Sequence, residues 1–314
     1  MSRSTSRPTA RRGGRRAARA AGVLAALALT LSACAPGSSG SDDTAGISAG
    51  TADDPIRIGV VNSGDAYWDT FTKAAADDGL TVKIVNFSDY QLPNQGLADG
   101  DLDVNQFQHL QFLAGYNQSS GDDLTPIGAT AVYPLALYSA KHTSLEDIPQ
   151  GGEVAIPNDD TNQARALLVL QEAGLISLKD GGSSLSTPAD VVADKSKVTV
   201  TPVDAAQTAL SLKDVDASII NNDFVGDAHL SEDDALFTDD PDSAAAEPYI
   251  NVWVSRAEDA NDKTLQKLID IYHTPEVEKG VLAASGGTGV IKDNDPADLK
   301  RILGKITDDM AAKG

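Results

Sequence analysis

An arginine near the start of an expected helix is the first candidate for ligand chemistry. Arg165 follows a run of Asp and Thr residues, 159–161, that suits a helix N-cap. The helix dipole disfavours a cation there, so the position makes sense if Arg165 joins free backbone N–H groups in binding an anion, such as a ligand carboxylate. A surface ion pair with Asp159 or Asp160 would explain the same spacing equally well.

Two amides at the end of an apolar strand are the second candidate. Ile219 and Ile220 are followed by Asn221, Asn222 and Asp223. An amide both donates and accepts hydrogen bonds, which suits recognition of an amino or carboxylate group. Turn chemistry or a helix cap would use the same residues, and taken alone the segment favours that simpler role.

Aromatic, amide and imidazole side chains gather in two further segments, residues 89–94 and 103–109. The candidates in these segments are Tyr90, Asn105, Phe107 and His109. Together they would suit an apolar pocket with a polar end. The alternative is a buried aromatic stripe with a hydrogen-bonded histidine, and these residues alone favour it.

Signatures of catalysis and of metal binding are missing from the sequence. There is no Gly-x-Ser-x-Gly elbow, and Gly304-Lys305 lacks the rest of a phosphate-binding loop. The four histidines show no His-x-x-x-His spacing, and a single cysteine excludes an intrachain disulfide or a thiolate zinc site. We therefore expect a protein that is not an enzyme, with no catalytic residue, no metal and no cofactor.

The first 33 residues differ from the rest of the chain in charge. They contain seven arginines and no acidic residue, so a net charge of −21 for the whole chain becomes −28 for the remainder. Such acidity disfavours nucleic-acid binding, which needs a basic surface. The apolar residues 20–31 are too few for a membrane span of about 20 residues but suit the core of a signal peptide.

The end of this apolar run, Leu31-Ser32-Ala33-Cys34, resembles a bacterial lipobox. We therefore predict a lipoprotein signal peptide at 1–33 and a lipid on Cys34, which implies anchoring to the cell membrane on its extracytoplasmic face. The alternative is an uncleaved anchor with an incidental cysteine. Residues 34–54 are rich in Gly, Ser, Ala, Thr and Asp, and this composition predicts a flexible tether.

Hydrophobic periodicity predicts an α/β body after the tether. The expected strands are 56–61, 81–87, 154–157, 198–203, 217–220 and 249–254. The expected helices are 66–78, 92–99, 106–117, 161–174, 261–274, 276–284 and 296–312. Strand, helix and strand joined by short connections form the βαβ pattern of an α/β sheet.

Two extended stretches, near 131–138 and 248–254, bracket a middle α/β segment. This arrangement predicts two lobes between which the chain crosses twice, with 55–135 and 250–314 in one lobe and 136–249 in the other. Ligand clefts in such proteins lie between the lobes, at the ends of strands and helices.

Taken in order, these segments resemble the NlpA/MetQ family, the lipoprotein substrate-binding components of methionine ABC transporters. The matching stretches are SDYQLPNQGLADGDLDVNQFQH (88–109), GATAVYPLALYS (128–139), VAIPNDDTNQARALLVLQEAGLISLKDG (154–181), IIN (219–221) and PYINVWV (248–254). The resemblance implies a two-lobe periplasmic-binding-protein fold, type II-like, that closes on free methionine. It also implies an ABC transporter permease as the partner.

The resemblance assigns roles to individual residues as well. The family's ligand arginine falls on Arg165 and its strand-end asparagine on Asn221, and Asn162 lies beside the arginine at the same helix start. The family's pocket for the ligand side chain falls on Tyr90, Phe107, His109 and Tyr133.

Three departures from the family pattern leave the ligand open. Phe112 and Phe224 stand where relatives often have tyrosine, and residues 62–65 replace a longer loop. The ligands that fit are L-methionine, D-methionine, a methionine peptide or another apolar amino acid. An enzyme on the same fold and a surface lipoprotein without a transport role are the alternative functions.

Overall fold

The computed structural model describes residues 46–313. The predicted signal peptide, 1–33, and the predicted lipid-bearing Cys34 lie outside the described residues. Within the described part of the chain, no helix is both long and apolar enough to span a membrane.

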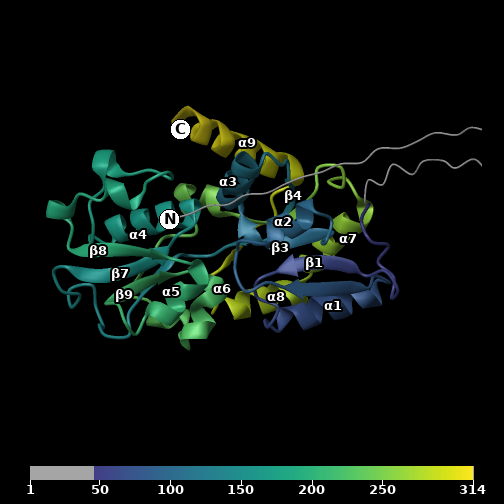
Figure 1. Cartoon of the computed structure of the whole chain (residues 1–314). Coiled ribbons are helices and arrows are strands. Elements are labelled where there is room, and N and C mark those ends of the chain that lie inside the picture. The colour runs from purple at the N-terminus through teal and green to yellow at the C-terminus, as the bar shows by residue number, and fades with distance from the viewer. Residues whose placement is uncertain (1–45, 314) are drawn as a thin grey trace, which may run out of the picture. The chain divides into compact units, whose positions relative to one another are not determined.

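A five-stranded sheet forms the centre of what we call the first lobe (Figure 1). Its strand order is β2 (Val82–Asn86), β1 (Ile56–Val60), β3 (Val104–His109), β11 (Asn251–Ser255) and β4 (Thr125–Ala129). Strand β1 runs parallel to both of its neighbours, whereas β11 is antiparallel to β3 and β4. The helices of this lobe are α1 (Tyr67–Asp77), α2 (Pro93–Ala98), α3 (Leu110–Ser120), α7 (Lys263–Tyr272), α8 (Pro275–Ala284) and α9 (Pro296–Lys313).

Aromatic side chains fill the core of the first lobe on one face of its sheet. Phe71 of α1 stacks on Trp253 of β11 with ring centroids 5.7 Å apart, and Tyr272 of α7 meets Trp253 edge-on at 5.6 Å. Strand β4 carries Gly128 beneath α7, where an added Cβ would lie 2.7 Å from Ile269. Close packing of this kind makes the lobe a rigid support for residues at its edge.

A second five-stranded sheet forms the centre of the second lobe (Figure 1). Its strand order is β10 (Phe237–Thr238), β6 (Ala136–Tyr138), β9 (Ala217–Ile220), β7 (Gly152–Pro157) and β8 (Val198–Val203). Strand β7 is parallel to β8 and β9, and β6 is antiparallel to β9 and β10. Helices α4 (Asp160–Glu172), α5 (Ala205–Ser211) and α6 (Asn222–Val225) follow β7, β8 and β9 in the chain.

The chain crosses between the two sheets twice. It leaves the first sheet after β4 and enters the second at β6, and it returns from β10 to β11 through a 3₁₀ segment, Ala244–Tyr249. The first crossing is braced by β5 (Ala131–Val132), which pairs antiparallel with β12 (Val290–Ile291). The predicted two-lobe α/β fold with two crossing segments is therefore present.

The predicted helix 106–117 is wrong over its first four residues. Residues 104–109 form β3, and the helix α3 begins only at Leu110. Strand β3 lies between β1 and β11, and all six of its residues are buried. A central strand that is buried on both faces does not alternate between apolar and polar residues. The amides and imidazole of β3 also lack the apolar character that indicates a buried strand.

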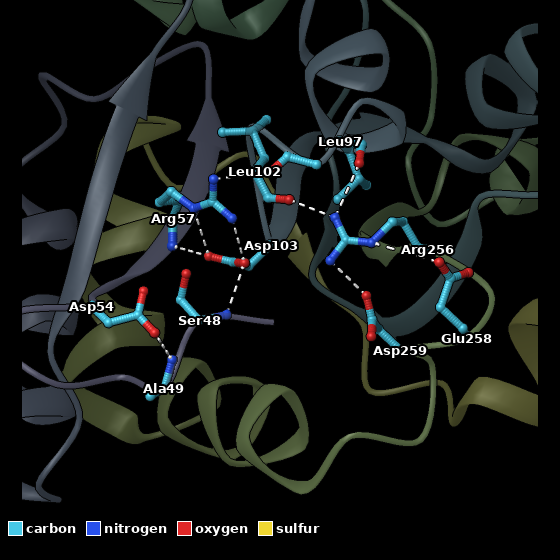
Figure 2. Close-up of polar contacts among 11 residues, drawn as sticks. Ser48, Ala49, Asp54, Arg57, Leu97, Leu102, Asp103, Arg256, Glu258 and Asp259 are labelled. Atoms are coloured by element: carbon cyan, nitrogen blue, oxygen red, sulfur yellow. Dashed lines mark hydrogen bonds and ion pairs between the residues drawn. The ribbon is translucent and has the colours of Figure 1, made fainter. Parts of the chain in front are cut away.

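The predicted tether, 34–54, is too long at its C-terminal end. The backbone N–H of Ser48 donates to Asp103 Oδ1 at 3.0 Å, and Ile47 packs against the aromatic core of the first lobe. Asp103 is held in turn by Arg57, whose Nη2 lies 2.8 Å from Asp103 Oδ1 (Figure 2). The amino-acid composition predicted a tether here because composition does not reveal a hydrogen bond to a buried carboxylate. Asp103 lies 55 residues from Ser48 in the sequence.

Candidate functional site

Residues from both lobes converge on a small cavity of about 20 Å³. The first lobe contributes Tyr90, Phe107, His109 and Phe112, the second lobe contributes Asn162, Arg165, Asn221 and Asp223, and the first crossing contributes Tyr133. This volume is far below the roughly 300–1,000 Å³ of open ligand pockets. The walls of the cavity therefore lie close together, as in a cleft that has closed.

Helix α4 positions Arg165 at the cavity. The N-cap residue Asp159 accepts from the backbone N–H of Asn162 at 2.9 Å, so the first turn of α4 is fixed where it follows β7. Arg165 lies in the next turn and is 5% exposed. Its guanidinium lies over the ring of Tyr249, 4.2 Å from the centroid, which adds a cation–π contact.

Asp239 is the carboxylate that pairs with Arg165. Arg165 Nε donates to Asp239 Oδ2 at 2.8 Å, and Nη2 donates to Asp239 Oδ1 at 3.2 Å and to the backbone oxygen of Tyr133 at 2.9 Å. The surface pair with Asp159 or Asp160 that the spacing allowed is therefore not formed. Asp239 also accepts from the backbone N–H of Leu135 at 2.7 Å, so it ties α4 to the first crossing.

One nitrogen of Arg165 is not used in this pairing. Among the described residues, Nη1 has no hydrogen-bond partner, whereas Nε and Nη2 are both bonded. Arg165 lines the cavity. The guanidinium can therefore offer a charged donor to an acceptor inside the cavity.

A chain of hydrogen bonds joins His109, Asn162 and Asn221 across the two lobes. Asn162 Oδ1 lies 3.2 Å from His109 Nε2 and accepts from Asn221 Nδ2 at 3.0 Å. Because His109 Nδ1 accepts from the backbone N–H of Phe112, the proton of the neutral ring is on Nε2. Burial, aided by the positive charge of Arg165, lowers the pKa of His109 to about 3, so the imidazole is neutral near pH 7.

Asn221 lines the same cavity and carries an acceptor that has no partner among the described residues. The residue is 7% exposed, and its Oδ1 is buried without a hydrogen-bond partner among the described residues. A buried polar atom without a partner is costly and is expected to be matched by a ligand. Asn221 is thus placed to accept a hydrogen bond from a ligand amino group.

Aromatic rings form the apolar wall of the cavity. The ring centroid of Tyr90 is 6.0 Å from that of Phe107 and 6.0 Å from that of Phe112. Phe224, from α6 of the second lobe, reaches within 5.1 Å of Tyr90, so the aromatic cluster spans both lobes. An apolar wall beside a polar end suits a ligand with a charged head and an uncharged side chain.

Asn105 does not line the cavity, although the sequence made it a candidate. Its Nδ2 donates to Asn94 Oδ1 at 2.9 Å, and its Oδ1 accepts from Gln108 Nε2 at 3.0 Å. All three residues are buried. Asn105 therefore supports Gln108, which does line the cavity.

Asp223 and Asp239 are site residues that the sequence did not single out. Asp223 lines the cavity from α6, and its Oδ2 accepts from the hydroxyl of Tyr90 at 2.8 Å, across the two lobes. Asp239 lies 74 residues from its partner Arg165. The chain has 46 acidic residues, so no sequence signal distinguished these two from the rest.

A larger cavity of about 640 Å³ adjoins the first one. The two share Tyr133, Asn222 and Asp223, and the larger one also has Asp65 and Ser285 in its wall. We place the site in the smaller cavity because Arg165, Asn221 and the aromatic rings of Tyr90, Phe107 and Phe112 line it.

The chemistry available in the cavity is that of binding. It offers a cationic donor, a neutral amide acceptor, a carboxylate, a neutral imidazole and aromatic rings, and these groups match the two charges and the side chain of an amino acid. Within residues 46–313, no group of three or more His, Cys, Asp or Glu side chains could hold a metal ion.

The comparisons with known proteins agree on one family. The model of the NlpA lipoprotein family matches residues 56–292. The probable D-methionine-binding lipoprotein MetQ of Haemophilus influenzae is 38% identical over 226 residues, which cover 71% of this chain and 81% of that protein.

Solved structures extend the comparison to the fold. The substrate-binding protein of a methionine transporter from Streptococcus pneumoniae is 38% identical with a TM-score of 0.71, covering 76% of this chain and 95% of that one. A nutrient-binding protein from Burkholderia cenocepacia bound to methionine is 36% identical with a TM-score of 0.70, covering 76% of this chain and 99% of that one. With more than two thirds of its length matched by the family model and by relatives at least 36% identical, the chain belongs to the NlpA lipoprotein family.

Proposed function

We propose that this protein is an extracytoplasmic solute-binding protein that captures methionine and delivers it to an ABC transporter permease. One observation carries the proposal. Arg165 and Asn221 line one cavity that also has an aromatic wall, and each keeps one polar atom, Nη1 and Oδ1, that has no hydrogen-bond partner among the described residues. Similar proteins carry methionine in their names or were solved with it.

The two charges of methionine determine how it lies in the cavity. A closed site must replace the hydration of both charges. Arg165 Nη1 donates to the carboxylate, and Asn221 Oδ1 accepts from the amino group. Asn162 holds Asn221 in place through the 3.0 Å bond to its Nδ2.

The side chain of methionine lies against the aromatic wall. Tyr90, Phe107 and Tyr133 supply rings, and His109 is neutral and buried, so none of the four places a charge against the thioether. Sulfur beside aromatic rings is a favourable contact. The pocket therefore prefers an unbranched apolar side chain to a charged one.

Ligand binding draws the two lobes together. Arg165 and Asn221 belong to the second lobe, whereas Phe107 and His109 belong to the first. A ligand contacts both sets only in the closed arrangement, so it shifts the population of the protein toward that arrangement. The permease then recognises the closed form.

A lipid on Cys34 holds the protein at the membrane. A single acyl chain binds membranes only marginally, so stable anchoring needs the several chains that bacterial lipoproteins carry. Palmitate labelling should mark the wild-type chain, and Cys34→Ala should lose the label and be released into the medium. Equal labelling of the two proteins would contradict the anchor.

Isothermal titration calorimetry of the full chain tests the ligand. We expect L- or D-methionine to bind, leucine to bind more weakly and lysine not to bind. Native mass spectrometry of the purified protein gives an independent reading through any ligand that co-purifies. Absence of binding for both enantiomers of methionine would overturn the proposal.

A further inference from the structure

Asp223 is a carboxylate in the cavity wall that has no cationic ion-pair partner among the described residues. Its Oδ2 accepts from the Tyr90 hydroxyl at 2.8 Å, and its Oδ1 accepts from Asn222 Nδ2 at 3.0 Å. Both donors are neutral. Among residues 46–313, no Lys, Arg or His side chain forms an ion pair with Asp223.

The charges around Asp223 do not compensate it. Arg165, the cation of the same cavity, is already paired with Asp239. Burial raises the pKa of Asp223 to about 6, a hydrogen bond from Tyr90 opposes that rise, and the negative charge of Asp65 adds to it. Asp223 therefore presents the cavity with a carboxylate that has no ion-pair partner among the described residues.

Asn221 Oδ1 is a second acceptor in the same cavity wall. It lies on the residue two positions before Asp223 and has no hydrogen-bond partner among the described residues. A neutral acceptor and an anion, both in the wall of one cavity, suit a primary ammonium group, which has three N–H donors.

We propose that the Asp223 carboxylate is the counter-ion for the α-ammonium group of the ligand and makes a free amino group a requirement for binding. This inference rests on the proposed function and specifies the class of ligand. With the ligand carboxylate on Arg165 Nη1 and its ammonium group on Asn221 and Asp223, both ends of the amino acid are fixed. An N-acylated amino acid loses the ammonium group, and the first residue of a peptide loses the carboxylate. Free amino acids satisfy both ends.

The hydrogen bond between Tyr90 and Asp223 suggests a different role for Asp223, in holding the two lobes together. The test must distinguish this role from pairing with the ammonium group. If Asp223 served only to accept from Tyr90 and hold the lobes together, its loss would weaken every ligand to the same extent. If it pairs with the ammonium group, its loss weakens only the ligands that carry one. The ratio of the affinity for a ligand with an amino group to the affinity for a ligand without one distinguishes these roles.

The test uses the full chain and two ligands, methionine and desamino-methionine, in which hydrogen replaces the amino group. Wild type should prefer methionine by at least ~100-fold. Asp223→Asn should weaken methionine by ~10- to 50-fold and desamino-methionine by less than about threefold. Asp223→Ser provides a second neutral variant, and thermal melting shows that each variant is folded.

Tyr90→Phe is the matched control, because it removes the bond between the lobes and keeps the carboxylate. It should weaken both ligands by a similar factor and leave their ratio within about threefold of wild type. Equal losses of both ligands in Asp223→Asn would overturn the ammonium assignment and leave the proposed function intact. Failure of the wild type to bind methionine would overturn both.

Discussion

Two arginines in this molecule each pair with an aspartate, and they use their donors differently. In the first lobe, Arg57 bonds through Nε and Nη2 to Asp103 (Figure 2). Its Nη1 donates to the backbone oxygen of Gly100. In the cavity, Arg165 bonds through Nε and Nη2 to Asp239, with Nη2 also bonded to Tyr133, and its Nη1 has no described partner.

The difference separates a structural ion pair from a binding group. Every nitrogen of the Arg57 guanidinium is satisfied within one lobe, and Asp103 also accepts from the backbone N–H groups of Arg57 and Ser48. Nothing is left there for a ligand. At Arg165, by contrast, the donor Nη1 has no partner among the described residues, and Arg165 lines the cavity. Completeness of hydrogen bonding, more than the presence of a buried pair, indicates which arginine binds ligand.

Arg165→Ala should have the largest effect on binding. Removing the cation leaves a ligand carboxylate without its partner in a closed site, at a cost of roughly 2–5 kcal/mol, or about 30-fold to several thousand-fold in affinity. Isothermal titration calorimetry with methionine measures the loss. Arg57→Ala is the matched control and should keep its affinity within about threefold. If Arg165→Ala also stays within threefold of wild type, the proposed carboxylate anchor is wrong.

Of these two variants, Arg57→Ala should have the larger effect on the free energy of unfolding. It leaves Asp103, which is fully buried, without its cation. Breaking a buried pair costs about 3–5 kcal/mol, and the partial exposure of Arg57 reduces this to roughly 2–4 kcal/mol of unfolding free energy. Urea unfolding followed by circular dichroism measures the change. An unchanged midpoint would show that this pair does not hold the N-terminal segment to the sheet.

Asn221→Ala should have a smaller effect on binding than Arg165→Ala, because it removes a neutral hydrogen bond and no charge. The loss of one such bond in a closed site costs about 1–2 kcal/mol, or roughly 5- to 30-fold in affinity. His142→Ala serves as the control, because His142 pairs with Asp216 away from the cavity wall. Calorimetry should find this control near wild type, and an Asn221→Ala affinity equal to it would remove Asn221 from the site.

The sequence allowed the two lobes and most cavity residues to be predicted, but not the partners of those residues. Strands such as β1 carried an apolar alternation, and Arg165 and Asn221 lay in long stretches that resemble the family. The polar strand β3 was mistaken for a helix start because burial on both faces removes periodicity. Asp239 was missed because it meets Arg165 only through the fold, from 74 residues away in a chain rich in aspartate.

The pH dependence of stability should distinguish Asp103, the partner of Arg57, from Asp223 in the cavity wall. Burial alone would raise the pKa of Asp103, but hydrogen bonds from Arg57 and Ser48 lower it. Ionised Asp103 therefore stabilises the fold above its unfolded pKa of about 4, and this contribution is lost as the pH falls further. Asp103→Asn should be less stable than wild type near pH 7, with the deficit shrinking below about pH 4.

The pH dependence of stability that Asp223 contributes should have the opposite sign to that of Asp103. Burial raises its pKa to about 6, so between about pH 4 and 6 the folded state holds a proton that the unfolded state has released. Stability from this group therefore decreases as the pH rises through that window. A shift of two pKa units corresponds to at most about 3 kcal/mol, and solvent screening at this partly exposed residue reduces it to roughly 1–2 kcal/mol.

Without ligand, Asp223→Asn should be more stable than wild type at pH 7.5, and its advantage should vanish by about pH 4. Thermal melts of wild type and both Asn variants across this range measure the two differences, and an advantage of Asp223→Asn that persists at pH 4 would mean that ionisation of Asp223 is not its cause.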